Sequence, residues 1–326
     1  MILGLSQASY RWVAYPGLRI DQPEYGFRGM PFPYGSTTGG LREFDDNIGW
    51  WLDRCAEWDL EVLYLAMSWF KDEAAVVANA REMARRGIDW IGSVSGAWAV
   101  PEEEWPECRA EARRKLELAA AAGMKTTVIV NADPPGAEGQ PVPNGGLRFG
   151  HFSREIAIDQ QIENMIRNLG EFVAVAEECG VRLAYENHMD YRISELVEVV
   201  EGVDSPWLGI CYDFANSYSV VEDQLQAAHR AAPYTLVTHV KDMRVQSITT
   251  TGEPRFFLTP IGYGDVEVAE IFEVLQQGAP DADNLPNCAS PPCLPEFDPQ
   301  LWMKLSVEWL GANCAGYFPR RFQTAA

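Results

Sequence analysis

Residues 183–190 read Leu183-Ala184-Tyr185-Glu186-Asn187-His188-Met189-Asp190, an apolar strand pattern that ends in side chains able to bind a metal ion or transfer protons. Alternate side chains of a strand point to opposite faces, so we expect Glu186 and His188 on one face and Tyr185 and Asn187 on the other. Two later apolar runs also end in polar side chains, at Asp213 and at His239 with Lys241. This pattern predicts parallel strands that converge on one site.

Working outward from this stretch, strand and helix signals alternate along the whole chain, with glycines closing several helices. Besides the three strands above, strands are predicted at 2–7, 60–66, 90–94, 126–130 and 285–290. Helices are predicted at 46–58, 72–86, 102–122, 154–179, 193–203, 222–232, 266–277 and 300–310. Eight strand–helix pairs predict a single (β/α)8 TIM barrel spanning 1–326. The alternative, an open doubly wound sheet, would be supported by a Gly-rich phosphate loop after the first strand, and the sequence has none.

Three long connections interrupt the pattern. An aromatic insertion spans 10–43, a Pro- and Gly-rich loop spans 133–152, and a polar, hairpin-like excursion spans 244–264. Loops this long in compact domains are usually either functional or disordered, and the aromatic content of the first favours function. We expect the aromatic insertion to cover the barrel mouth or to contact a second chain, because its aromatics follow no helical or strand period. The alternative is a loop packed on the barrel rim for stability.

The composition restricts the class of protein. The net charge is -21 and the pI about 4.6, which argues against nucleic-acid and anionic-membrane partners. The first residues lack the features of a signal peptide, and no apolar run approaches the ~20 residues that span a bilayer. The seven cysteines are odd in number and scattered. We therefore expect reduced thiols in a cytoplasmic protein.

Glu186, Asp213 and His239 follow one another at intervals of about one strand–helix unit, so we place them on strands five, six and seven, side by side on the barrel rim. One imidazole and two carboxylates suit a divalent ion such as Mn²⁺, Co²⁺ or Mg²⁺. The alternative is a network of salt bridges at the rim without a metal. Three ligand types on three consecutive strand ends favour the metal.

Two further polar side chains flank these ligands. His188 lies on the face of Glu186 and can act as a base. Lys241 lies beside His239 and either neutralises a developing oxyanion or forms a salt bridge to Glu186 or Asp213. The remaining histidines, His151 in a loop and His229 in a helix, are interpreted as structural or solvent-facing.

Four segments together resemble the xylose isomerase-like TIM barrels, the sugar isomerase/epimerase or AP endonuclease family 2 superfamily. They are Tyr185-Glu186-Asn187-His188, Cys211-Tyr212-Asp213-Phe214-Ala215-Asn216, His239-Val240-Lys241-Asp242 and Gly262-Tyr263-Gly264-Asp265. The resemblance implies that Glu186, Asp213 and His239 hold a divalent ion, which binds two oxygens of a sugar and stabilises an enediolate. Within the superfamily, the aromatic insertion and the Asn187-His188 pair look similar to the α subunit of C-glycoside deglycosidases. Those enzymes eliminate an aglycone from a 3-oxo-glycoside together with a small β subunit.

The sequence departs from this family at the fourth ligand. The family places a glutamate on strand eight, and here that position falls on or near Ser290. Glu308 superficially resembles the missing motif, but Asp298-Pro299 and the apolar spacing place it on a helix. Glu296, in a loop, is a third candidate. The position stays unassigned, with water or substrate expected there.

The resemblance implies proton abstraction beside a carbonyl of a sugar or keto-sugar, with the metal polarising that carbonyl. Epimerases of the family use two glutamates as paired acid and base, so without the strand-eight glutamate His188 becomes the expected base. We place isomerase or epimerase chemistry first and a deglycosidase-like lyase second. A non-catalytic binding or partner subunit is the third interpretation, and the metal content of the protein distinguishes it. A homo-oligomer, or a hetero-oligomer with a small β subunit, is compatible with the sequence.

Overall fold

A computed structural model of the chain describes residues 1–6, 9, 48–131, 156–247, 254–291 and 298–322. The whole of the aromatic insertion and of the Pro- and Gly-rich loop lies outside these residues, as do the tip of the 244–264 excursion, His151 and Glu296. The predictions for those segments stay predictions.

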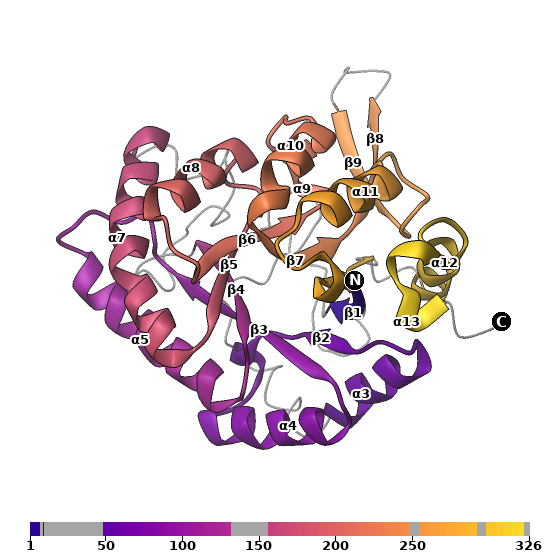
Figure 1. Cartoon of the computed structure of the whole chain (residues 1–326), viewed down its shortest axis with the longest axis horizontal. Helices are drawn as coiled ribbons and strands as arrows, with labels where there is room; N and C mark the ends of the chain where they lie inside the picture. Colours follow the sequence, from indigo (N-terminus) through magenta and orange to yellow (C-terminus); the bar gives the residue numbers. More distant parts are fainter. Residues whose placement is uncertain (7–8, 10–47, 132–155, 248–253, 292–297, 323–326) are drawn as a thin grey trace, which may run out of the picture.

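Eight parallel strands close into a barrel in the order β1-β10-β7-β6-β5-β4-β3-β2 (Figure 1). The predicted (β/α)8 barrel is confirmed. The barrel strands are β1 (Ile2–Ser6), β2 (Val62–Tyr64), β3 (Asp89–Gly96), β4 (Thr126–Asn131), β5 (Arg182–Glu186), β6 (Leu208–Asp213), β7 (Thr235–Val240) and β10 (Pro286–Ala289).

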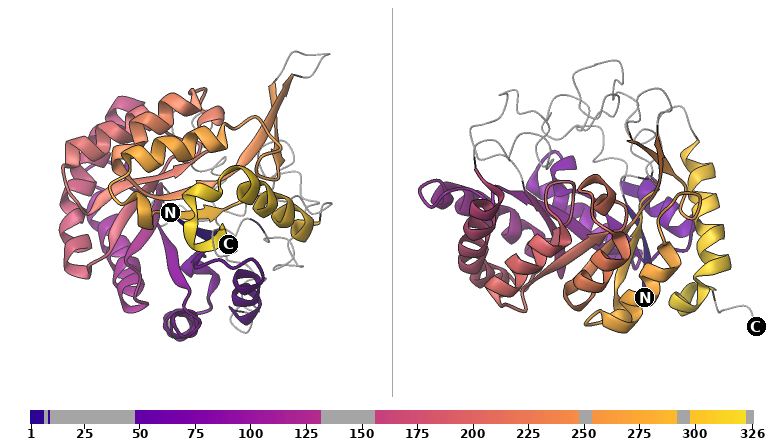
Figure 2. Two further views of the ribbon diagram at one scale, coloured as in Figure 1. Left: turned by 45° about the vertical axis from the view of Figure 1, so that its right-hand side comes forward. Right: turned by 90° about the horizontal axis from the view of Figure 1, so that it is seen from above.

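Helices form the outer layer of the described structure, as both views in Figure 2 show. The long helices are α3 (Ile48–Glu57), α4 (Glu73–Arg85), α5 (Trp105–Ala121), α7 (Ile158–Cys179), α8 (Ile193–Val203), α10 (Gln224–Ala231), α11 (Val268–Gly278) and α12 (Pro299–Asn313). Short helical turns are η3 (Met67–Trp69), α9 (Asn216–Ser219), η4 (Ala232–Tyr234), η5 (Ala282–Asn284), η6 (Ala315–Tyr317) and α13 (Pro319–Phe322).

The helix ends follow the expected capping chemistry. The Asp72 side chain accepts a hydrogen bond from the backbone N–H of Ala75 at the start of α4. Gly180, in the left-handed conformation, ends α7. The helix predicted at 222–232 begins two residues later than expected, because the Asp223 side chain caps α10 by accepting from the backbone N–H of Gln226.

Apolar side chains fill the space on both sides of the barrel wall. A small cluster lines the barrel interior, and a larger one lies between the strands and the helices. On β5, Ala184 belongs to the inner cluster and Tyr185 to the outer one. The alternation of a strand therefore directs Glu186, the next residue, into the barrel. The interior cluster consists of Val62, Tyr64, Ile91, Val128, Val130, Ala184, Cys211, Val237 and Cys288.

The predicted excursion contains two antiparallel strands, β8 (Asp242–Ser247) and β9 (Pro254–Thr259), which stand out from the barrel in Figure 1. The buried Asp242 carboxylate holds the base of this hairpin, because it accepts hydrogen bonds from the backbone N–H groups of Gly262, Gly264 and Val266. The described part of the excursion is thus an antiparallel pair of strands.

Among the helices that the structure describes, none is both long and apolar enough to cross a membrane. The six cysteines within the described residues are free thiols.

Val221, in the turn between α9 and α10, carries backbone strain: its φ is +56° and its side chain is 77% exposed. The left-handed conformation costs a β-branched residue about 1–2 kcal/mol, whereas Asn tolerates it. We expect Val221→Asn to raise the free energy of unfolding by about 1 kcal/mol, measured by denaturant titration. Val221→Ala keeps most of the strain and serves as the control. An Asn variant no more stable than the Ala variant would show that the turn is not strained.

Candidate metal centre

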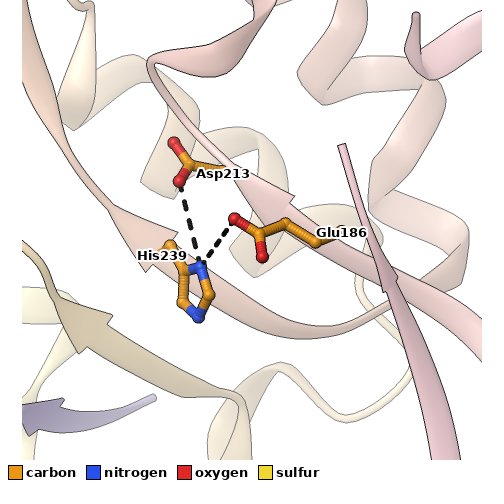
Figure 3. A group of neighbouring side chains, drawn as sticks. All are labelled: Glu186, Asp213 and His239. Atoms are coloured by element: carbon orange, nitrogen blue, oxygen red, sulfur yellow. Dashed lines mark hydrogen bonds and ion pairs between the residues drawn. The ribbon is translucent and has the colours of Figure 1, made fainter. Parts of the chain in front are cut away.

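The carboxyl ends of three neighbouring strands bring together Glu186, Asp213 and His239 (Figure 3). Glu186 is the last residue of β5, Asp213 is the last of β6, and His239 lies one residue before the end of β7. All three side chains are buried, and one ligand atom from each lies within 4.8 Å of the others. The structure thus brings together the three residues that the sequence predicted as metal ligands.

The imidazole of His239 faces both carboxylates through one nitrogen. Its Nδ1 lies 3.2 Å from Glu186 Oε1 and 3.8 Å from Asp213 Oδ2. The other carboxylate oxygen of Asp213, Oδ1, accepts a hydrogen bond from the backbone N–H of Ala215, which directs Oδ2 toward the imidazole. The ring of Tyr64 packs against the imidazole, with 4.4 Å between the ring centroids.

The charges around Glu186 keep its carboxyl ionised. Burial alone would raise the pKa of Glu186, but the charged and hydrogen-bonding groups around it, led by His239, together outweigh burial and lower that pKa to about 2. The charges of His188 and Lys241 act in the same direction. At neutral pH the side chain of Glu186 is therefore an anion.

Lys241 forms an ion pair with one of the predicted ligands. Its Nζ lies 2.5 Å from Asp213 Oδ2 and 3.4 Å from Asn216 Oδ1. Burial would lower the pKa of Lys241, but the carboxylates of Asp213 and Glu186 outweigh burial and raise it. Of the two alternatives for Lys241, the salt bridge to Asp213 is present, and it places the ammonium group at the edge of the site.

These donors fit a divalent metal ion. Two buried carboxylates lie close together, and the imidazole of His239 faces both of them through its Nδ1. Buried charges are stable only when they are paired or coordinate a metal. Oxygen and imidazole donors without thiolate suit Mn²⁺, Mg²⁺ or Co²⁺.

Comparison with known proteins identifies the family. The family model described as "Xylose isomerase-like TIM barrel" matches residues 26–282. The chain belongs to this family. The resemblance that the sequence motifs indicated is therefore confirmed, while the further likeness to C-glycoside deglycosidases stays a prediction. No curated protein sequence matches the chain.

Solved structures of this family's fold resemble the chain over most of its length. D-psicose 3-epimerase from Clostridium cellulolyticum H10, in complex with D-tagatose, has a TM-score of 0.63 and 14% identity over 96% of this chain and 98% of its own. 3-Keto-D-glucoside 4-epimerase from E. coli has a TM-score of 0.59 and 15% identity over 96% and 99%. A xylose isomerase-like TIM barrel protein from Mycobacterium smegmatis, in complex with magnesium, has a TM-score of 0.60 and 18% identity over 87% and 93%. At these identities the likeness shows the fold.

At the end of β10, the eighth strand of the barrel, the described residues include no carboxylate. Ser290 follows β10, is buried, and donates its backbone N–H to the carbonyl of Val240. Glu308 lies on α12, as predicted, where its exposed carboxylate is 3.8 Å from Lys304 Nζ. Among the described residues, only Glu186, Asp213 and His239 form a group able to hold a metal ion.

The other two described histidines differ in burial and in their distance from the ligands along the chain. His188 is half-buried just beyond β5, and its charge acts on Glu186. His229 is exposed on α10, in agreement with its interpretation as solvent-facing. Sequence reasoning did not single out Tyr64, although its place at the end of a barrel strand is a signal for a site residue. It also gave no role to Asp190, where burial raises the pKa to about 7.

Proposed function

We propose that the protein is a divalent-metal-dependent enzyme of the sugar isomerase/epimerase type, which abstracts a proton next to a carbonyl of a sugar or keto-sugar. The observation that carries the proposal is the buried convergence of Glu186, Asp213 and His239 at the carboxyl ends of β5, β6 and β7. Family membership supports it, and so do the epimerases among the similar structures.

In the proposed mechanism, Glu186, Asp213 and His239 hold the ion, Mn²⁺ in our proposal with Co²⁺ or Mg²⁺ as alternatives. When bound, such an ion supplies Lewis-acid polarisation of a substrate carbonyl. One similar structure binds a zinc atom and another is in complex with magnesium, which supports a divalent ion in a protein of this fold.

The proton transfers fall to this chain's own side chains. We assign the base to His188, because it follows Glu186 at the barrel mouth and an imidazole titrates near neutrality. Lys241 forms an ion pair with Asp213, and we assign to it the stabilisation of the negative charge that develops on the substrate oxygen. Return of the proton to another carbon or another face gives isomerisation or epimerisation.

A second function is favoured by one observation: the described end of β10 offers Ser290 and no glutamate. An epimerase with paired glutamates needs that carboxylate, whereas a lyase with one base does not. The alternative is therefore elimination of an aglycone from a 3-oxo-glycoside, in the manner of C-glycoside deglycosidases and together with a small β subunit. A non-catalytic partner subunit is the third possibility, and failure to bind Mn²⁺ would favour it.

Incubation in D₂O tests the proposal. The Mn²⁺-loaded protein is mixed with ketohexoses and with 3-oxo-glucosides, and products are followed by NMR and mass spectrometry. We expect deuterium at the carbon beside the carbonyl, with an epimer or isomer as product. Release of an aglycone would instead support the lyase. No exchange and no product with either substrate class would contradict both functions.

Ser290→Glu tests the fourth ligand position. A third anionic oxygen suits Mn²⁺ or Mg²⁺, so we expect Mn²⁺ affinity to rise by roughly tenfold, about 1.4 kcal/mol. Calorimetric titration of chelator-treated protein measures it, with Ser290→Gln as an uncharged control of equal size. Unchanged affinity in a folded Glu variant would mean that Ser290 is not the position, and Glu296 would then be the next candidate.

A further inference from the structure

Hydrogen bonds connect the ends of the four neighbouring strands β5, β6, β7 and β10 around the proposed metal site. Between β6 and β7, the backbone N–H of Phe214 donates to the carbonyl of His239 over 3.1 Å. Between β7 and β10, the backbone N–H of Ser290 donates to the carbonyl of Val240 over 2.9 Å. These two ties use main-chain atoms alone, so no side-chain substitution removes their partners.

The tie between β5 and β6 is different, because a side chain makes it. The backbone hydrogen bonds between β5 and β6 end with a long one, 3.4 Å from the N–H of Asn187 to the carbonyl of Cys211. Beyond it, the Asn187 side chain takes over: its Oδ1 accepts the backbone N–H of Asp213 at 2.7 Å, and its Nδ2 donates to the Asp213 carbonyl at 3.1 Å. The side-chain amide of Asn187 thus supplies the acceptor and the donor that a neighbouring backbone would offer to Asp213.

This amide links the backbone of Asp213 to β5. On its other side, the register between β6 and β7 shifts at Ile210/Cys211 and is regular from Cys211 to Asp213. Asn187 is 2% exposed. A buried amide with both polar atoms satisfied holds its partner firmly, since breaking either bond leaves an unpaired polar group.

We propose that Asn187 is a positioning residue of the metal centre: it fixes the backbone of Asp213 so that Oδ2 faces His239 and Glu186. The proposal rests on the metal site of the proposed function and adds a role that the ligand set does not contain. The dipeptide Glu186-Asn187 then has two roles, since one residue supplies a ligand and the next orients the ligand on the neighbouring strand.

Asn187→Leu, which keeps the number and branching of the side-chain heavy atoms and removes both hydrogen bonds, tests this role. We expect Mn²⁺ affinity, measured by calorimetric titration of the whole chain, to fall about 10- to 100-fold, the usual loss when a group that orients a ligand is removed. The matched control is Asn168→Leu. Asn168 is also buried, and its Nδ2 donates two hydrogen bonds, to the carbonyls of Trp98 and Val100. It lies far from the ligands in sequence. That variant should lose stability and keep its Mn²⁺ affinity.

Hydrogen exchange of the Asp213 amide gives a readout without metal. We expect this N–H to be protected in the wild type and to exchange at least about tenfold faster in Asn187→Leu, but not in Asn168→Leu.

A folded Asn187→Leu with wild-type Mn²⁺ affinity would overturn the proposal, and so would unchanged protection of the Asp213 amide. Absence of Mn²⁺ binding by the wild type would instead contradict the proposed function, and the exchange experiment would still decide the positioning. If Asn187→Leu does not fold, Asn187→Ser replaces it under the same criteria.

Discussion

Glu186→Gln and Asp213→Asn are each expected to abolish tight Mn²⁺ and Co²⁺ binding and activity together. Each change removes one of the two anionic ligands from a buried site, while the imidazole of His239 remains. We expect a loss of Mn²⁺ affinity of at least about a hundredfold, or about 2.7 kcal/mol. Calorimetric titration with Mn²⁺ and turnover of the same preparations measure the two effects.

Glu308→Gln is the matched control for these variants. It makes the same chemical change on the exposed face of α12, so metal binding and turnover should stay at wild-type levels. Wild-type activity that survives exhaustive chelation would refute the metal dependence. Retention of Mn²⁺ affinity in Glu186→Gln would remove Glu186 from the ligand set.

His188→Asn is expected to keep the metal and lose most turnover. His188 lies close enough to Glu186 for its charge to act on that carboxyl, yet it does not belong to the group of converging ligand atoms. Loss of a general base usually lowers kcat by roughly a hundred- to ten-thousand-fold. Steady-state kinetics with saturating Mn²⁺, together with a metal titration, separates the two properties.

His229→Asn, on the exposed face of α10, is the control and should leave both properties unchanged. If His188→Asn had near-normal kcat, another group would have to be the base. If it lost its Mn²⁺ instead, His188 would be a ligand.

The sequence was sufficient to predict the barrel because strand and helix periods are local properties. The predicted helix 193–203 coincides with α8, and Asp298 caps α12 with Pro299 at its first position, as expected. Helix boundaries were less accurate where caps compete. The prediction for 222–232 missed that Asp223, a better cap than Glu222, caps α10, so that the helix begins at Gln224.

The site was predictable only in part, for physical reasons. Glu186, Asp213 and His239 follow from strand ends, because parallel strands deliver their carboxyl ends to one rim. Strand alternation placed Asn187 on the outer face with Tyr185. In the structure Asn187 lies just past the end of β5, where alternation no longer holds, and its side chain bonds sideways to β6. Contacts across strands, such as the packing of Tyr64 on His239, cannot be predicted from local periods.

One measurement tests the central claim most directly: a crystal structure of the Mn²⁺-loaded protein with anomalous data collected at the manganese edge. The account predicts a single strong anomalous peak within bonding distance of Glu186, Asp213 and His239, with the remaining coordination positions open to water or substrate. The same map would show what lies at Ser290. An anomalous peak elsewhere, or no peak in crystals grown with saturating Mn²⁺, would contradict the account.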